Sequence, residues 1–110
     1  MSQRNKELAA FVLDQLEGIG RLRALPMMGG YLFYIDGRIF GGLYDSEELL
    51  VRITPASRRA LPDEQPVLPY EGSKQPMLRC PLLEDREAFR RLVQDMLPEL
   101  PEPKSKKAKQ

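Results

Sequence analysis

The sequence predicts a two-layer α+β domain in which helices pack on an antiparallel sheet of about five strands. Short β-rich runs are joined by tight turns, and strands joined in this way are antiparallel neighbours. The predicted helices number three, too few to cover both faces of a sheet. The 110 residues suffice for one domain, which we place at residues 1–100, followed by a tail at 101–110.

The first predicted element is a helix that ends near Gly18. Its apolar residues recur every three to four positions, the spacing of one helix face. Gly18 and Gly20 are predicted to end it, because glycine readily adopts the left-handed conformation of a helix C-terminus. The predicted buried residues are Leu8, Phe11, Val12 and Leu16, and the predicted solvent-facing residues are Lys6, Glu7, Asp14 and Gln15.

A meander of strands is predicted next. Asp36 and Gly37 form the strongest hairpin signal in the chain, because both residues tolerate positive φ in a two-residue turn. A polar turn at 45–47 leads into the following strand, and the run before Pro26 is predicted as an edge strand whose partner the sequence does not reveal. The predicted strands are residues 22–25, 31–35, 38–44 and 49–53.

The second half of the chain is predicted to contain two helices around a second hairpin. Thr54 and Pro55 are typical of a helix start, and Pro62 follows the end of this short helix. Strands at 67–70 and 77–80 are predicted to flank a turn at 71–74. The last helix is predicted to be capped by Glu84 and Asp85, to be closed by Pro98 and to bury Phe89, Leu92, Val93, Met96 and Leu97.

Composition excludes several kinds of chemistry. The chain has no histidine and a single cysteine, which rules out Ser-His-Asp and Cys-His catalysis, histidine metal sites and an internal disulfide. No cofactor motif is present, and Cys80 is predicted to be a small buried hydrophobe. A pair of carboxylates could still support acid–base catalysis, although no motif indicates which pair. We expect a protein that is not an enzyme and binds no metal or cofactor. No signal peptide or membrane span is predicted, which favours a cytoplasmic location.

Charge is unevenly distributed along the chain. The net charge is +1, from 17 basic and 16 acidic residues. The last ten residues hold four lysines and one glutamate, so the tail carries +3 and residues 1–100 carry −2. The proline- and lysine-rich tail is predicted to be disordered, because it offers almost no apolar surface to bury. Weak, sequence-independent contact of its lysines with nucleic acid is a further expectation.

The segment Met-Met-Gly-Gly-Tyr is the most unusual local sequence and allows two interpretations. The glycines could expose backbone N–H groups that bind a small anion, assisted by nearby arginines. The structural interpretation, which we favour, makes the glycine pair a bulge or close crossing and the methionines adaptable filler. The candidate ligand or partner surface consists of Arg21, Arg23, Met27, Met28, Gly29, Gly30 and Tyr31.

A second glycine pair lies in the run RIFGGLY, residues 38–44. This run faintly resembles the aromatic strand of RNA-recognition domains, but Gly41 and Gly42 follow Phe40 where a second ring would be needed. We interpret this glycine pair as the mark of a β-bulge.

Four segments together resemble the N-terminal domain family of the TfoX/Sxy competence regulators. They are residues 16–31 (LEGIGRLRALPMMGGY), 34–43 (YIDGRIFGGL) and 48–54 (ELLVRIT), and the hairpin predicted between Tyr70 and Met77. In the family, the pattern Gly-x-x-Arg-x-Arg-x-Met-Phe-Gly-Gly-Tyr is followed by a short strand with Asp-Gly. The matching positions are Gly20, Arg21 or Arg23, Met27, Gly29, Gly30, Tyr31, Asp36 and Gly37, whereas Met28 replaces the usual phenylalanine and Pro26 is unusual.

The resemblance implies a bacterial α+β module with a secretion-chaperone-like fold and no assigned catalytic activity. The competence regulators carry a second, helical domain and act with a transcription activator. This chain ends in the lysine tail where that domain would begin, so we do not expect a competence activator. We expect a regulatory module that binds a protein partner or a second copy of itself as a homodimer.

Overall fold

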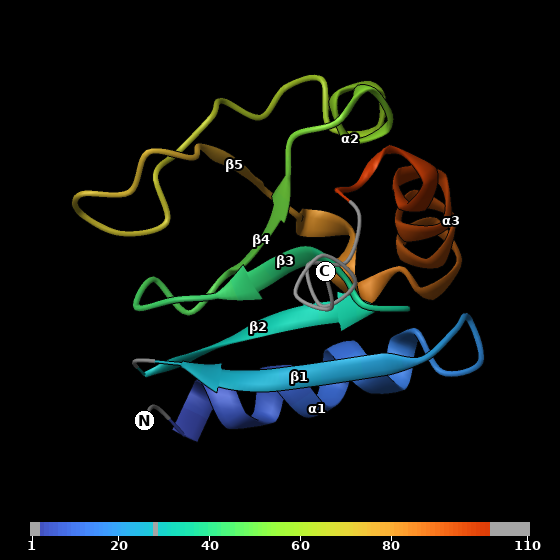
Figure 1. The fold of residues 1–110 in the computed structure, drawn as a ribbon, viewed down its shortest axis with the longest axis horizontal. Helices are drawn as coiled ribbons and strands as arrows, with labels where there is room; N and C mark the ends of the chain where they lie inside the picture. Colours follow the sequence, from blue (N-terminus) through green and yellow to red (C-terminus); the bar gives the residue numbers. More distant parts are fainter. Residues whose placement is uncertain (1–2, 28, 102–110) are drawn as a thin grey trace, which may run out of the picture.

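The computed structural model describes residues 3–27 and 29–101. It confirms the α+β class, with five strands, three α-helices and two short 3-10 helices (Figure 1). The predicted tail lies, apart from Pro101, outside the described residues. The elements are α1 (Gln3–Gln15), β1 (Leu22–Met27), β2 (Gly30–Ile35), β3 (Arg38–Leu43), β4 (Leu49–Arg52), α2 (Pro55–Ala60), β5 (Met77–Arg79), η1 (Pro81–Glu84), α3 (Arg86–Met96) and η2 (Leu97–Glu99).

The five strands form one antiparallel sheet in the order β1-β2-β3-β4-β5. The predicted edge strand β1 exists, extends through Pro26 and pairs with β2. The Asp-Gly hairpin between β2 and β3 is confirmed, since Asp36 and Gly37 have φ values of 53° and 83°. The Asp36 carboxylate also accepts a hydrogen bond from the backbone N–H of Arg21 at 3.0 Å, which ties the start of β1 to this turn.

One face of the sheet packs against all three α-helices and forms the main core. Phe33 of β2, Phe40 of β3 and Phe89 of α3 are fully buried in it, with the first two rings 6.0 Å apart. Val12 of α1 and Ala56 of α2 join the same cluster. Figure 1 shows α1 running along β1 while α3 stands at the end of the sheet. This shared core confirms the two-layer arrangement.

The opposite face is called the helix-free face here, because its buried cluster holds only strand and loop residues among those described. The buried residues are Tyr44, Leu50 and Met77, and partly buried Met27, Leu32 and Val67 pack against them. Strand alternation places Arg23, Leu25, Met27, Leu32, Tyr34, Ile39, Leu50, Arg52 and Met77 on this face. Residues 67–75, in the loop before β5, pack over the β4–β5 end of this face (Figure 1).

The predicted strand at 67–70 is wrong. Only Val67 pairs with β5, through two reciprocal backbone hydrogen bonds of 2.8 Å with Met77. Pro66, Pro69 and Pro76 flank this pair, and proline cannot donate to a strand ladder. Residues 68–76 therefore form a loop that is closed by a single bridge, and β5 pairs with β4 instead.

The buried face of α1 also differs from the prediction. Phe11 is 36% exposed, whereas Gln15 is 5% exposed and lies in the interior. The Gln15 amide donates to the carbonyl oxygen of Leu83 at 2.8 Å, and Arg90 donates to the backbone oxygens of Gln15 and Glu17. Polar contacts with distant backbone thus set the rotation of this helix, and apolar spacing does not reveal them.

The remaining helices follow the prediction closely. Thr54 caps α2 by accepting a hydrogen bond from the N–H of Ser57 at 3.1 Å, and Pro55 is its first residue. Asp85 caps α3 by accepting from the N–H of Ala88 at 3.2 Å. Among the described residues, no helix is long and apolar enough to cross a bilayer.

Candidate functional site

The glycine pair of the predicted surface lies where β1 turns into β2, with Gly29 in the turn and Gly30 as the first residue of β2. Gly29 has a φ of +85°, which glycine adopts without strain. Gly30 passes so close to the backbone of β3 that an added Cβ would overlap the carbonyl oxygen of Leu43. The side-chain amide of Asn5 links this turn to the end of β3 by donating hydrogen bonds to the backbone oxygens of Gly29 and Tyr44, both at 3.1 Å. The predicted close crossing is therefore confirmed at Gly30.

The side chains around the glycine pair point to different faces of the sheet. Tyr31 packs against the main core, with its ring stacked 6.4 Å from that of Phe33. Met27 belongs to the helix-free face, and Met28 lies outside the described residues. The segment is thus divided between the two faces.

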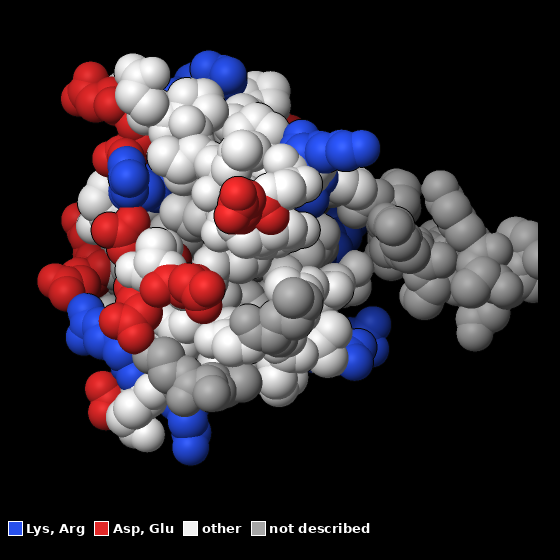
Figure 2. Space-filling view, turned by 90° about the vertical axis from the view of Figure 1, so that its left-hand side faces the viewer, with Lys and Arg blue, Asp and Glu red and all other residues white. Residues whose placement is uncertain are grey.

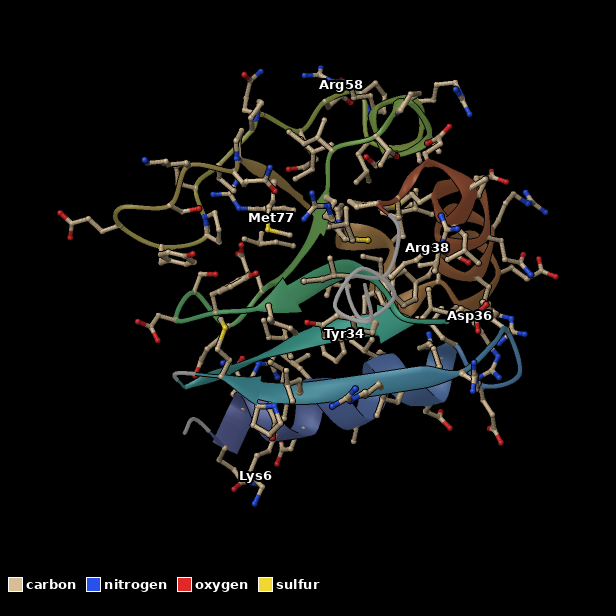
Figure 3. The ribbon with its side chains drawn as sticks, viewed as in Figure 1. Lys6, Tyr34, Asp36, Arg38, Arg58 and Met77 are labelled. Atoms are coloured by element: carbon tan, nitrogen blue, oxygen red, sulfur yellow. The ribbon has the colours of Figure 1, made fainter. Side chains whose placement is uncertain are left out.

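The structure does not bring the two arginines of the predicted surface to the glycine pair. Arg23 lies near the start of β1, about 13 Å from the end of the strand at Met27 at about 3.3 Å per residue, and Gly29 lies in the turn beyond that end. Arg21 lies beside Asp36, which Figure 3 shows at the far end of the β2–β3 hairpin. Arg23 does share the helix-free face with Met27, so these two residues lie along one strand of one surface.

A cavity of about 250 Å³ lies between the helix-free face and the loop of residues 68–76. Of the described residues of the predicted surface, Met27 alone contributes to it. Figure 3 shows Met77, another lining residue, on β5. The lining residues are Met27, Leu32, Ile39, Tyr44, Arg52, Pro69, Tyr70, Ser73, Lys74, Gln75 and Met77. The sequence gives little indication of this cavity, because its walls come from strands and a loop that share no motif.

Two tyrosines meet in this cavity. The ring of Tyr44 lies 6.0 Å from that of Tyr70, and its hydroxyl donates to Met77 Sδ at 3.7 Å. Burial is the main reason that the pKa of Tyr44 is raised, with a smaller contribution from Tyr70, while Arg52 opposes the shift. The phenol therefore stays neutral at physiological pH and acts as a hydrogen-bonding group.

A second cavity of about 250 Å³ lies between the start of α1 and η1. Four glutamates and two arginines line it, and Arg79 pairs with Glu48 at 2.9 Å. Figure 2 shows acidic side chains gathered toward one side of the molecule. Within residues 3–27 and 29–101, no group of histidine, cysteine or carboxylate side chains is arranged to hold a metal ion.

Cys80 also lines the second cavity but is 6% exposed, as predicted for a small buried hydrophobe. Burial is the main reason that its pKa is raised to about 12. The thiol is therefore protonated at neutral pH and is a poor nucleophile.

Comparisons with known proteins identify the family of this chain. A protein of Spirochaeta aurantia described as an uncharacterized 12.7 kDa protein in trpE 5'region is 35% identical over 101 residues, covering 92% of this chain and 87% of that protein. No solved structure gives a significant match. Residues 14–98 match the TfoX N-terminal domain, so the match extends from the end of α1 through α3. The chain therefore belongs to the TfoX N-terminal domain family, as its sequence predicted.

Proposed function

We propose that this chain is a non-catalytic regulatory module that binds a protein partner on the β1–β2 part of its helix-free face. The observation that carries the proposal is Leu25, a large apolar side chain that is 36% exposed at the centre of the edge strand β1. Leu32, opposite Leu25 in the strand register, continues the apolar surface onto β2. Apolar surface bordered by charge is typical of interaction sites.

The charges around this surface define the partner. Arg23 borders Leu25 on β1, and Arg52 lies on the same face of β4. Within the described part of the chain, neither forms an ion pair with a carboxylate. A partner that presents apolar side chains flanked by Asp or Glu would complement both features.

The proposal of binding without turnover is supported by the chemistry of the side chains. The sequence contains no histidine, and the raised pKa of Cys80 leaves its thiol protonated. The regulatory character rests on the family resemblance and is part of the same proposal.

The test is affinity purification of the chain from its native cells, with one matched pair of double variants. Arg23→Glu with Leu25→Asp alters the proposed surface. Arg91→Glu with Phe11→Asp makes the same changes of charge and polarity on α3 and α1, where both residues are also exposed. We expect one discrete partner to be retained by the wild type and by the α-helical double variant, and to be lost with the β1 double variant.

Two results would contradict the proposal. One is retention of the same partner by both double variants, and the other is turnover of a substrate that depends on a single carboxylate. If the retained partner is a second copy of the chain, the size of the wild-type protein in solution will be halved by the β1 double variant.

A further inference from the structure

We propose that the cavity between the helix-free face and the loop of residues 68–76 binds a small organic anion with an apolar, preferably aromatic, body. This site shares Leu32 and Arg52 with the proposed partner surface but takes a different ligand, and its test does not depend on a partner being found. It also differs from an anion site at the Gly29–Gly30 turn, because its charges come from β4 and the loop.

The size of the cavity fits a metabolite. Its volume of about 250 Å³ exceeds the roughly 150 Å³ of a cavity known to hold benzene and lies just below the usual range of drug-sized pockets. A molecule on the order of ten to fifteen non-hydrogen atoms would fill it.

The floor and walls of the cavity are apolar and adaptable. Leu32 and Ile39 contribute branched side chains from the centre of the sheet, and Met27 and Met77 contribute thioethers on either side. Methionine changes rotamer easily and makes favourable contacts between its sulfur and an aromatic ring. The Tyr44 ring, tilted 47° from Tyr70, adds an aromatic wall that suits a flat ligand.

The charge at the cavity is positive. Arg52 and Lys74 line it, and no described Asp or Glu does. Neither cation has a carboxylate partner among the described residues. An arginine guanidinium binds a carboxylate through two parallel hydrogen bonds, so the acid group of a ligand would lie at Arg52 with Lys74 beside it.

The second cavity serves as an internal comparison for this assignment. It has the same volume but is lined by four glutamates, and one of its two arginines is already paired with Glu48. A small anion would meet excess negative charge there. The two cavities have the same volume, so the anion is assigned to the first cavity on the basis of its positive charge.

Backbone contacts within the loop of residues 68–76 define its conformation over the cavity. The bridge between Val67 and Met77 closes it at the base. Gly72 takes a φ of +92°, and the Ser73 hydroxyl accepts a hydrogen bond from the N–H of Gln75 at 3.3 Å. These contacts define the turn that carries Lys74, which lines the cavity together with Arg52.

The test is a titration of the full chain, labelled with ¹⁵N, followed by NMR. The ligands are phenylacetate and indole-3-acetate, each compared with its neutral amide, which has the same shape. We expect both acids to shift the backbone resonances of Leu32, Tyr44, Tyr70 and Met77, and to bind at least about tenfold more tightly than their amides.

A pair of double variants locates the charge. Arg52→Gln with Lys74→Gln should weaken binding of the acids about tenfold or more. Arg58→Gln with Arg59→Gln removes the same charge from exposed positions on α2 and should leave the affinity unchanged. The proposal is overturned if neither acid shifts these resonances, if acid and amide bind equally, or if the α2 variant weakens binding as much as the cavity variant.

Discussion

The two faces of the sheet differ in how completely their side chains are buried. On the helix-covered face, Phe33 and Ile35 of β2 are fully buried, whereas their neighbours Leu32 and Tyr34 on the helix-free face are only partly so. Among the described residues, three helices contribute to the first face and one loop packs over part of the second. The helix-covered face should therefore contribute most of the stability, and the helix-free face leaves side chains exposed for the proposed binding.

The largest expected effect comes from truncating the helix-covered face. Phe33→Ala removes a fully buried ring that packs against Phe40, and we expect the free energy of unfolding to fall by about 3–5 kcal/mol. Leu32→Ala, one residue away on the other face, should lower it by only about 1 kcal/mol. Urea denaturation of both variants measures the difference, and equal losses would refute the division between the faces.

A somewhat smaller loss is expected at the corner where β1 and β2 meet. Gly30→Ala places a Cβ against the carbonyl oxygen of Leu43. The backbone must shift to avoid this overlap, so we expect the free energy of unfolding to fall by about 2–3 kcal/mol. Gly18→Ala is the matched variant, because an added Cβ meets nothing there and only the positive φ opposes it. Thermal unfolding in which Gly18→Ala is the more damaging change would contradict the structural role of Gly30.

A loss of about 1–2 kcal/mol is expected from the buried polar contact beneath α1. Gln15→Ala leaves the carbonyl oxygen of Leu83 without its 2.8 Å donor in the interior. Gln94→Ala removes the same side chain from an exposed position on α3 and should change stability by less than about 0.5 kcal/mol. Chemical denaturation should separate the two variants; coincident curves would mean that Gln15 does not set the rotation of α1.

The smallest effect on stability is expected on the helix-free face itself. Arg23→Glu with Leu25→Asp alters two exposed side chains that form no ion pair among the described residues. The free energy of unfolding should fall by about 1 kcal/mol or less, mainly because aspartate has a low strand propensity. A drop in the midpoint of urea denaturation as large as that of Gln15→Ala would show that this face stabilises the fold after all.

Local signals in the sequence predicted most of the fold. The turn at Asp36–Gly37, the cap at Thr54 and the apolar face that includes Phe89 each depend on residues close together in the chain. The partner of β1 and the burial of Gln15 depend on residues far away in the chain, and no local pattern encodes them.

The glycine pairs show the same limit. Gly41 was predicted to mark a bulge, and the register shift lies next to it, with Phe40 as the extra residue. Glycine is needed at position 41 for a different reason, because a Cβ there would overlap the carbonyl oxygen of Leu50 on β4. Likewise, the cavity on the helix-free face could not be predicted, because Arg52 and Lys74 come together only after β4 and the loop have packed.

The most direct test of the proposed division between the faces compares two positions of equal exposure. Leu25 on the helix-free face and Phe11 on α1 are both 36% exposed. A photoreactive amino acid placed at each position in turn, with irradiation in the native cells, reports which face is occupied. We predict a discrete covalent product from position 25 and none from position 11. A product from position 11 alone, or the same product from both positions, would contradict the assignment of binding to the helix-free face.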